Sequence, residues 1–137
     1  MDRPLSGQSD QIPNLTGPLE LSCHCRGVVL QVVLAEGLST AKRCDCSFCR
    51  RRGAMTADVR AADLRVIHAE TLGNYQFGPK TETHHFCTRC GVYTHHRRPA
   101  NGMEWGVNVG GLQGINPRDL DPVPWMDGAN WNPEAEI

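Results

Sequence analysis

The sequence has few aromatic residues, little net charge, no long apolar segment, and no cysteine outside three short groups. Aromatic residues make up 6% and hydrophobic residues 39% of its 137 residues, so we expect a thin core that metal cross-links would strengthen. The net charge of -1 provides no general attraction for nucleic acid or for an anionic membrane. No apolar run approaches the roughly 20 residues of a spanning helix. We therefore predict neither a nucleic-acid partner nor a membrane partner.

The beginning of the chain lacks the pattern of a secretory signal. Residues 1–7 contain no basic segment followed by an apolar one, which predicts a cytoplasmic, reducing location. In such a compartment clustered cysteines are metal ligands more often than disulfide partners. Residues 1–18 are polar and contain three prolines, so we predict a flexible N-terminal arm before a single domain over residues 19–137.

The informative residues that are present are seven cysteines in three groups. An odd number does not fit a disulfide framework, and cysteines so close in sequence converge readily on one metal ion. Because a tetrahedral zinc site takes four ligands, the number divides most simply into four and three. Four thiolates close a structural site, whereas three leave one position open to water or substrate. The groups are Cys23 and Cys25, then Cys44, Cys46 and Cys49, then Cys87 and Cys90.

Spacing alone does not determine which groups share a metal. The middle group supplies three ligands within six residues and can hold one ion by itself, which assigns the two outer pairs to a four-thiolate site by elimination. Such a site would close a chain loop of about sixty residues, where a metal cross-link stabilises most in theory. The open site is expected to hold its zinc less firmly than the closed one.

The remaining pattern is that of a mostly β protein without a long amphipathic helix. Leu19, Leu21, Cys23 and Cys25 alternate as on one face of a strand, with His24 on the other face. Residues 117–133 contain four prolines and two tryptophans, which predicts an irregular tail held by Trp125 and Trp131, with a short helical turn at 116–120. Further strands are predicted at 28–34, 54–59, 64–68, 72–77, 83–86, 92–96 and 105–109.

The middle group has a definite charge. Zinc with three thiolates carries about -1 and is a weaker Lewis acid toward water than zinc held by three neutral histidines, so it is better suited to holding another thiolate. Basic residues lie on both sides of the group, and we identify Arg50 and Arg51 as candidates to receive the carboxylates of a small-molecule thiol. Such charge runs are as often a solvated face. A second basic cluster, residues 95–98, is predicted to lie on the surface.

Three segments together resemble the glutathione-dependent formaldehyde-activating enzyme family, whose domain centromere protein V shares. The resemblance covers about residues 18–131. Any one segment alone would be weak evidence, but the three-part cysteine pattern is specific. The segments are Leu21-Ser22-Cys23-His24-Cys25-Arg26-Gly27-Val28, Cys44-Asp45-Cys46-Ser47-Phe48-Cys49-Arg50-Arg51 and Phe86-Cys87-Thr88-Arg89-Cys90-Gly91.

This resemblance implies an all-β fold of packed antiparallel sheets, called the β-tent, that is cross-linked by zinc. It implies a structural zinc at Cys23, Cys25, Cys87 and Cys90. It implies a second zinc at Cys44, Cys46 and Cys49, beside which glutathione is handled. The implied activity is that of a carbon–sulfur lyase, joining glutathione and formaldehyde into S-hydroxymethylglutathione or cleaving that adduct. Relatives often have His where this chain has Asp45, which we expect to accept a hydrogen bond from an arginine or to alter substrate preference.

Two other hypotheses compete with the hypothesis that the protein is an enzyme. In the first, a histidine such as His85 completes the second site, and the domain is a non-catalytic zinc-binding interaction module. In the second, His68 and Glu70 followed by Cys87 and Cys90 imitate the signature of a zinc deaminase. The deaminase hypothesis leaves five cysteines unexplained. His68 and Glu70 also lie in a predicted strand, whereas the deaminase motif belongs at the start of a helix. The sequence does not determine the oligomeric state, the aldehyde, or the true thiol.

Overall fold

The computed structural model describes residues 15–78, 80–98 and 104–130, which form three β-sheets and one short α-helix. The first sheet contains β1 (Leu19–Ser22), β2 (Val28–Val32) and β5 (Leu64–Ala69) in the order β1-β2-β5. The second has the order β4-β9-β8-β7-β6. Its strands are β4 (Thr56–Val59), β6 (Leu72–Tyr75), β7 (Thr83–Cys87), β8 (Tyr93–Arg97) and β9 (Trp105–Asn108).

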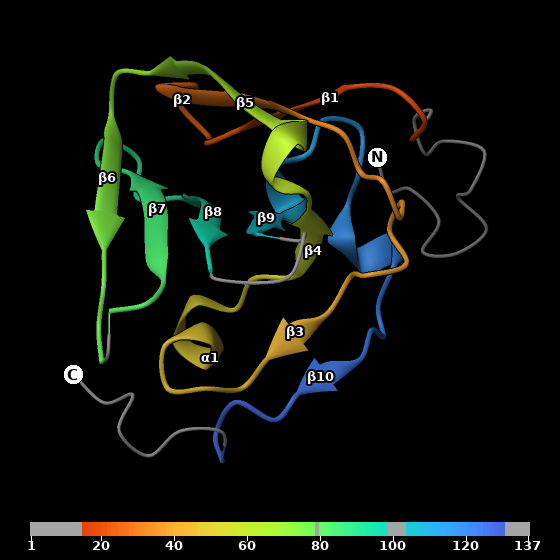
Figure 1. The fold of residues 1–137 in the computed structure, drawn as a ribbon, viewed down its shortest axis with the longest axis vertical. Coiled ribbons are helices and arrows are strands. Elements are labelled where there is room, and N and C mark those ends of the chain that lie inside the picture. Colours follow the sequence, from red (N-terminus) through yellow and green to blue (C-terminus); the bar gives the residue numbers. More distant parts are fainter. Residues whose placement is uncertain (1–14, 79, 99–103, 131–137) are drawn as a thin grey trace, which may run out of the picture.

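Every pairing in these two sheets is antiparallel, as the fold class requires. A small third sheet differs from these two, because its strands, β3 (Arg43–Cys44) and β10 (Trp125–Met126), run parallel. It lies beside α1 (Cys49–Arg52), on the opposite side of the molecule from β1, β2 and β5 (Figure 1). Short 3₁₀ turns occur at Ala61–Asp63, Val109–Gly111 and Pro117–Asp119. The last of these confirms the helical turn expected near residue 117, with Asn116 accepting a hydrogen bond from the Arg118 N–H.

The hydrophobic core lies between the two larger sheets. In β2 three consecutive residues are buried, as expected for a β-branched run that packs on both faces. A bridge from Leu21 to Leu112 joins the first sheet to the segment that follows β9. The fully buried side chains that fill this core are Leu21, Val28, Leu30, Val32, Ala57, Val59, Val107 and Val109.

Three expectations from the sequence are wrong. β1 ends at Ser22, so Cys23 and Cys25 lie in the turn before β2 and not in a strand. In this turn, where Arg26 has a φ of 66°, the two sulfurs lie 3.8 Å apart. The 95–98 cluster is not all surface, because His95 and His96 are 2% and 8% exposed, whereas Arg97 is exposed as expected. Trp125 is 62% exposed and cannot hold the tail by burial, and Trp131 lies outside the described residues.

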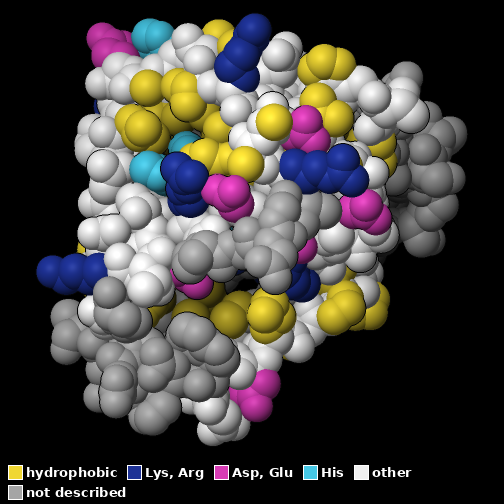
Figure 2. Space-filling model, viewed as in Figure 1, with side chains coloured by type: hydrophobic (Ala, Val, Ile, Leu, Met, Phe, Trp, Pro, Cys, Tyr) yellow, Lys and Arg dark blue, Asp and Glu magenta, His cyan; other side chains and the backbone are white. Residues whose placement is uncertain are grey.

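The described surface is of mixed character. Acidic, basic and apolar side chains are interspersed on the face shown in Figure 2. No described helix has the length and apolarity needed to cross a membrane.

Candidate metal centres

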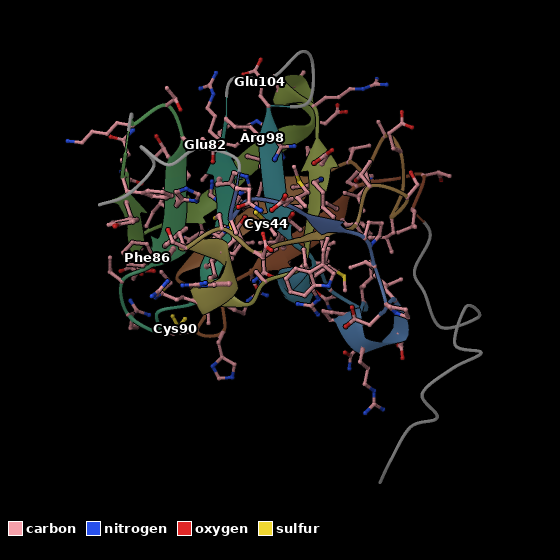
Figure 3. All side chains as sticks on the ribbon, turned by 90° about the horizontal axis from the view of Figure 1, so that it is seen from below. Cys44, Glu82, Phe86, Cys90, Arg98 and Glu104 are labelled. Atoms are coloured by element: carbon pink, nitrogen blue, oxygen red, sulfur yellow. The ribbon has the colours of Figure 1, made fainter. Side chains whose placement is uncertain are left out.

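The seven cysteines form two clusters, in the arrangement expected from the sequence. Cys23, Cys25, Cys87 and Cys90 form one cluster, and Cys44, Cys46 and Cys49 form the other, with all sulfurs of a cluster within 4.8 Å of one another. All seven are free thiols. Figure 3 labels Cys90 from the first cluster and Cys44 from the second and shows them in separate parts of the molecule.

The four-cysteine cluster joins the two large sheets. One pair lies in the turn after β1, and the other lies at the end of β7 and in the turn that follows it. The Cys25 sulfur lies 3.8 Å from that of Cys23 and 3.6 Å from that of Cys87. Two thiolates bound about 2.3 Å from one tetrahedral zinc are separated by about 3.8 Å. These two separations therefore match those of a tetrahedral zinc site.

Hydrogen bonds in this cluster converge on sulfur. The backbone N–H groups of Arg89 and Cys90 each donate to Cys87 Sγ at 3.3 Å, and the Thr71 hydroxyl lies 3.0 Å from it. Burial opposes the charged form, but these hydrogen bonds outweigh it and lower the pKa of Cys87 to about 5. Gly91 adopts a φ of 79°, which allows a tight turn just after Cys90. The thiolate is the form of cysteine that binds zinc, so these hydrogen bonds favour metal binding.

The three-cysteine cluster is carried by much shorter elements. Cys44 ends β3, Cys46 follows in a turn, and Cys49 is the first residue of α1. The N–H of Cys49 donates to Cys46 Sγ at 3.2 Å. A shared proton couples the other two thiols: the hydrogen bond from Cys49 lowers the pKa of Cys44 to about 6, while the pKa of Cys49 rises because it keeps that proton. The site thus already holds a thiolate near neutral pH.

The segment around β10 covers this cluster. The Met126 carbonyl accepts a hydrogen bond from the Asp45 N–H at 3.3 Å, and the Asp45 carboxylate accepts one from the Ala129 N–H at 3.0 Å. Gly128 packs so closely that a Cβ there would lie 2.5 Å from Cys44 Sγ. The partner of Asp45 is therefore backbone, not an arginine. Neither Asp45 nor Gly128 had a sequence signal for this contact.

A cavity of about 830 Å³ lies between α1 and the five-stranded sheet; none of the three cysteines lines it, but Phe48 and Arg52, which contact the cluster's segment, do. Its size is within the usual range for small-molecule sites. Phe48, which lies between two of the cysteine ligands in sequence, lines it together with the aromatic rings of Tyr75, His84 and Tyr93. The cationic lining residues are Arg43, Arg51 and Arg52.

The arginines predicted from the sequence occupy different places. Arg50 and Arg51 are both exposed, but only Arg51 lines the cavity, and it donates to the Ser47 carbonyl at 2.6 Å. Arg52 lines the cavity and also reaches the cluster, since its Nη2 lies 3.4 Å from Cys49 Sγ. The sequence marked Arg52 only as one of several flanking cations.

Among the described residues, no histidine belongs to either cysteine cluster. His85 instead places Nδ1 2.6 Å from the Asn74 amide oxygen and stacks on His95 with ring centroids 4.4 Å apart. His68 is exposed on β5 and pairs with Glu70 at 3.5 Å. Because Cys87 and Cys90 share their cluster with Cys23 and Cys25, the deaminase pattern is not assembled.

The fold and the donor sets define a class of protein: an all-β domain with one closed and one open cysteine cluster. The chain belongs to the glutathione-dependent formaldehyde-activating enzyme family, which it matches over residues 18–127. It is also similar to a crystal structure of a Rhodobacter sphaeroides protein, with 55% identity and a TM-score of 0.74. That match covers 78% of this chain and 99% of the other.

Proposed function

We propose that the protein is a zinc-dependent carbon–sulfur lyase that acts on adducts of glutathione-type thiols with formaldehyde. The observation that carries this proposal is the open cluster of Cys44, Cys46 and Cys49 beside a cavity lined by aromatic rings and arginines. Family membership supports the reaction class. The four-cysteine cluster would hold a second zinc with a structural role.

The three cysteines would supply the protein ligands and leave a fourth position open. Zinc bound there would lower the pKa of a substrate thiol. The chain's own residues bind and orient that thiol: Arg51 offers a guanidinium to a carboxylate, and the ring of Phe48 provides an apolar wall beside the cluster. Arg50 does not line the cavity, so Arg51 is the better candidate for the carboxylate partner.

The chemical balance of the reaction is simple. The thiol sulfur forms a bond to the carbonyl carbon of formaldehyde, the C=O π electrons move to oxygen, and the proton lost by the thiol ends on that oxygen. Cleavage runs through the same changes in reverse. Holding the thiol and aldehyde in one cavity makes the addition effectively unimolecular.

Exchange NMR of formaldehyde, glutathione and their adduct tests the proposal directly. The zinc-loaded protein is expected to accelerate the exchange, and Cys46→Ser is expected to abolish the acceleration. Ser47→Ala is the matched control, because Ser47 is the exposed neighbour of Cys46 in the same loop. No acceleration by protein that holds both zinc ions, or equal acceleration by Cys46→Ser, would contradict the proposal.

A further inference from the structure

Arg52, the last residue of α1, connects the three-cysteine cluster to the cavity wall and the sheet. Its Nη2 donates to Cys49 Sγ at 3.4 Å, and its Nη1 donates to His84 Nδ1 at 3.2 Å. These two contacts use both terminal nitrogens of the guanidinium fork, one on the cluster and one on β7. Neither Arg50 nor Arg51 shows a contact to a cysteine sulfur.

Two aromatic rings fix the plane of this guanidinium. Its central carbon lies 3.6 Å from the centroid of the Tyr93 ring and 4.7 Å from that of Phe48. Such stacking is favourable for the planar Arg side chain and pre-organises its hydrogen bonds. The side chain is therefore held from its faces by rings and from its end by hydrogen bonds.

The Tyr93 ring is itself held by a buried polar chain. Arg98 Nη1 lies 3.1 Å from His96 Nε2, and since a guanidinium can only donate, Nε2 accepts. Nδ1 of the neutral imidazole then carries the hydrogen and donates to the Tyr93 oxygen at 2.6 Å. Arg98 is anchored in turn by Asp58 at 2.5 Å. This chain gives the buried His96 and Tyr93 side chains hydrogen-bond partners.

The same reasoning assigns the hydrogen of His84. Because Arg52 donates to Nδ1, the other ring nitrogen, Nε2, carries the hydrogen. That Nε2 is buried without a hydrogen-bond partner among the described residues, as is the Nε of Arg52, and the nearest carboxylate oxygen, on Glu82, is 3.8 Å away. Two donors beside the cluster thus lack a protein acceptor, as expected for a place where a polar ligand group is received.

We infer that Arg52 is the positioning residue of the three-cysteine centre, which it holds through Cys49 and whose negative charge it offsets. The inference rests on the proposed function in one respect, that this cluster holds a metal ion. Three thiolates on a divalent ion carry about -1, and an incoming thiolate would be repelled without a nearby cation. Residues that hydrogen-bond to metal ligands typically change affinity or activity by about 10- to 100-fold when replaced.

Cobalt titration tests the inference without relying on turnover. The four-cysteine cluster is first loaded with one equivalent of zinc, and Co²⁺ is then added while its thiolate charge-transfer absorption is followed. Arg52→Met is expected to weaken Co²⁺ binding about 10- to 100-fold. Arg52→Lys is expected to lose less, because lysine keeps the charge but cannot stack and donate to Cys49 and His84 together. Arg65→Met, an exposed arginine on β5, removes the same charge and should bind like wild type.

A second measurement separates positioning from general folding. In Arg52→Lys loaded with saturating metal, KM for the thiol should rise more than kcat falls, because the retained fold still carries out the chemistry. Equal Co²⁺ affinity and KM in wild type and Arg52→Lys would overturn the inference, as would equal affinity in a folded Arg52→Met. A wild-type protein that takes up zinc but no Co²⁺ would overturn the proposed metal site and this inference with it. A protein that binds both ions but shows no lyase activity would overturn the proposed lyase function and not the role of Arg52 in metal binding.

Discussion

The two cysteine clusters use the same ligand chemistry on different supports. In the four-cysteine cluster Cys23 and Cys87 are 2% and 0% exposed, and the cluster joins segments 62 residues apart in the chain. In the three-cysteine cluster all members are partly exposed and lie within six residues, on a two-residue strand and a four-residue helix. From this comparison we expect the first cluster to stabilise the fold and the second to depend more on its neighbours.

The largest effect is expected from Cys87→Ser. It removes the sulfur on which three hydrogen bonds converge and opens the cluster that joins the two sheets. Structural zinc contributes about 10–16 kcal/mol of binding free energy, comparable to the whole stability of a domain. We expect loss of the cooperative unfolding transition by circular dichroism. A folded Cys87→Ser protein with an unchanged melting temperature would refute the structural role.

Cys46→Ser should have the opposite profile. Cys46 lies in the short loop outside the core, so the melting temperature should fall far less than in Cys87→Ser. Metal binding at the three-cysteine cluster and turnover should be lost. Differential scanning calorimetry with metal analysis on both variants measures the contrast. Similar melting temperatures for the two variants would remove the distinction between the clusters.

Gly128→Ala tests whether the tail shapes the open cluster. The added Cβ would lie 2.5 Å from Cys44 Sγ and 2.9 Å from the Cys46 nitrogen, so either the tail or the ligands must move. We expect metal affinity at this cluster alone to fall by about tenfold or more, by competition with a chromogenic chelator. Gly17→Ala is the control, since nothing lies within 4 Å of its Cβ position. Equal affinities in both variants would show that the tail is not part of the site.

A smaller effect concerns pH and the buried histidines of the five-stranded sheet. Burial lowers the pKa of His84 to about 4 and that of His95 to about 3. Below pH 6.5 the unfolded chain takes up protons that the folded chain does not, so the free energy of unfolding falls as pH falls toward 4. Each such histidine contributes up to about 1.4 kcal/mol per pH unit.

Urea unfolding between pH 7 and 5, at constant metal content, measures this slope. His95→Gln should flatten it, whereas His24→Gln, at an exposed position, should leave it unchanged. An equal slope in His95→Gln and wild type would show that His95 is not the source.

The cysteine spacing predicted the three groups, because metal ligands impose local spacings that do not depend on the rest of the fold, and elimination then paired the two outer groups. The β content followed from alternating and β-branched segments. The strand over Cys23 and Cys25 was predicted wrongly, because alternation in sequence does not reveal a left-handed residue such as Arg26, which turns the chain. Arg52 and Gly128 were not distinguished because their roles depend on contacts with Tyr93 and Cys44, which only the folded chain brings near.

The division between the two clusters is tested most directly by counting zinc ions during mild chelation, with native mass spectrometry and the formaldehyde–glutathione exchange assay on the same samples. We predict two zinc ions per chain, of which the chelator removes one. Activity should disappear with that ion while the circular dichroism spectrum stays native, and added zinc should restore it. Release of both ions together with unfolding, or full activity with one ion left, would contradict this prediction.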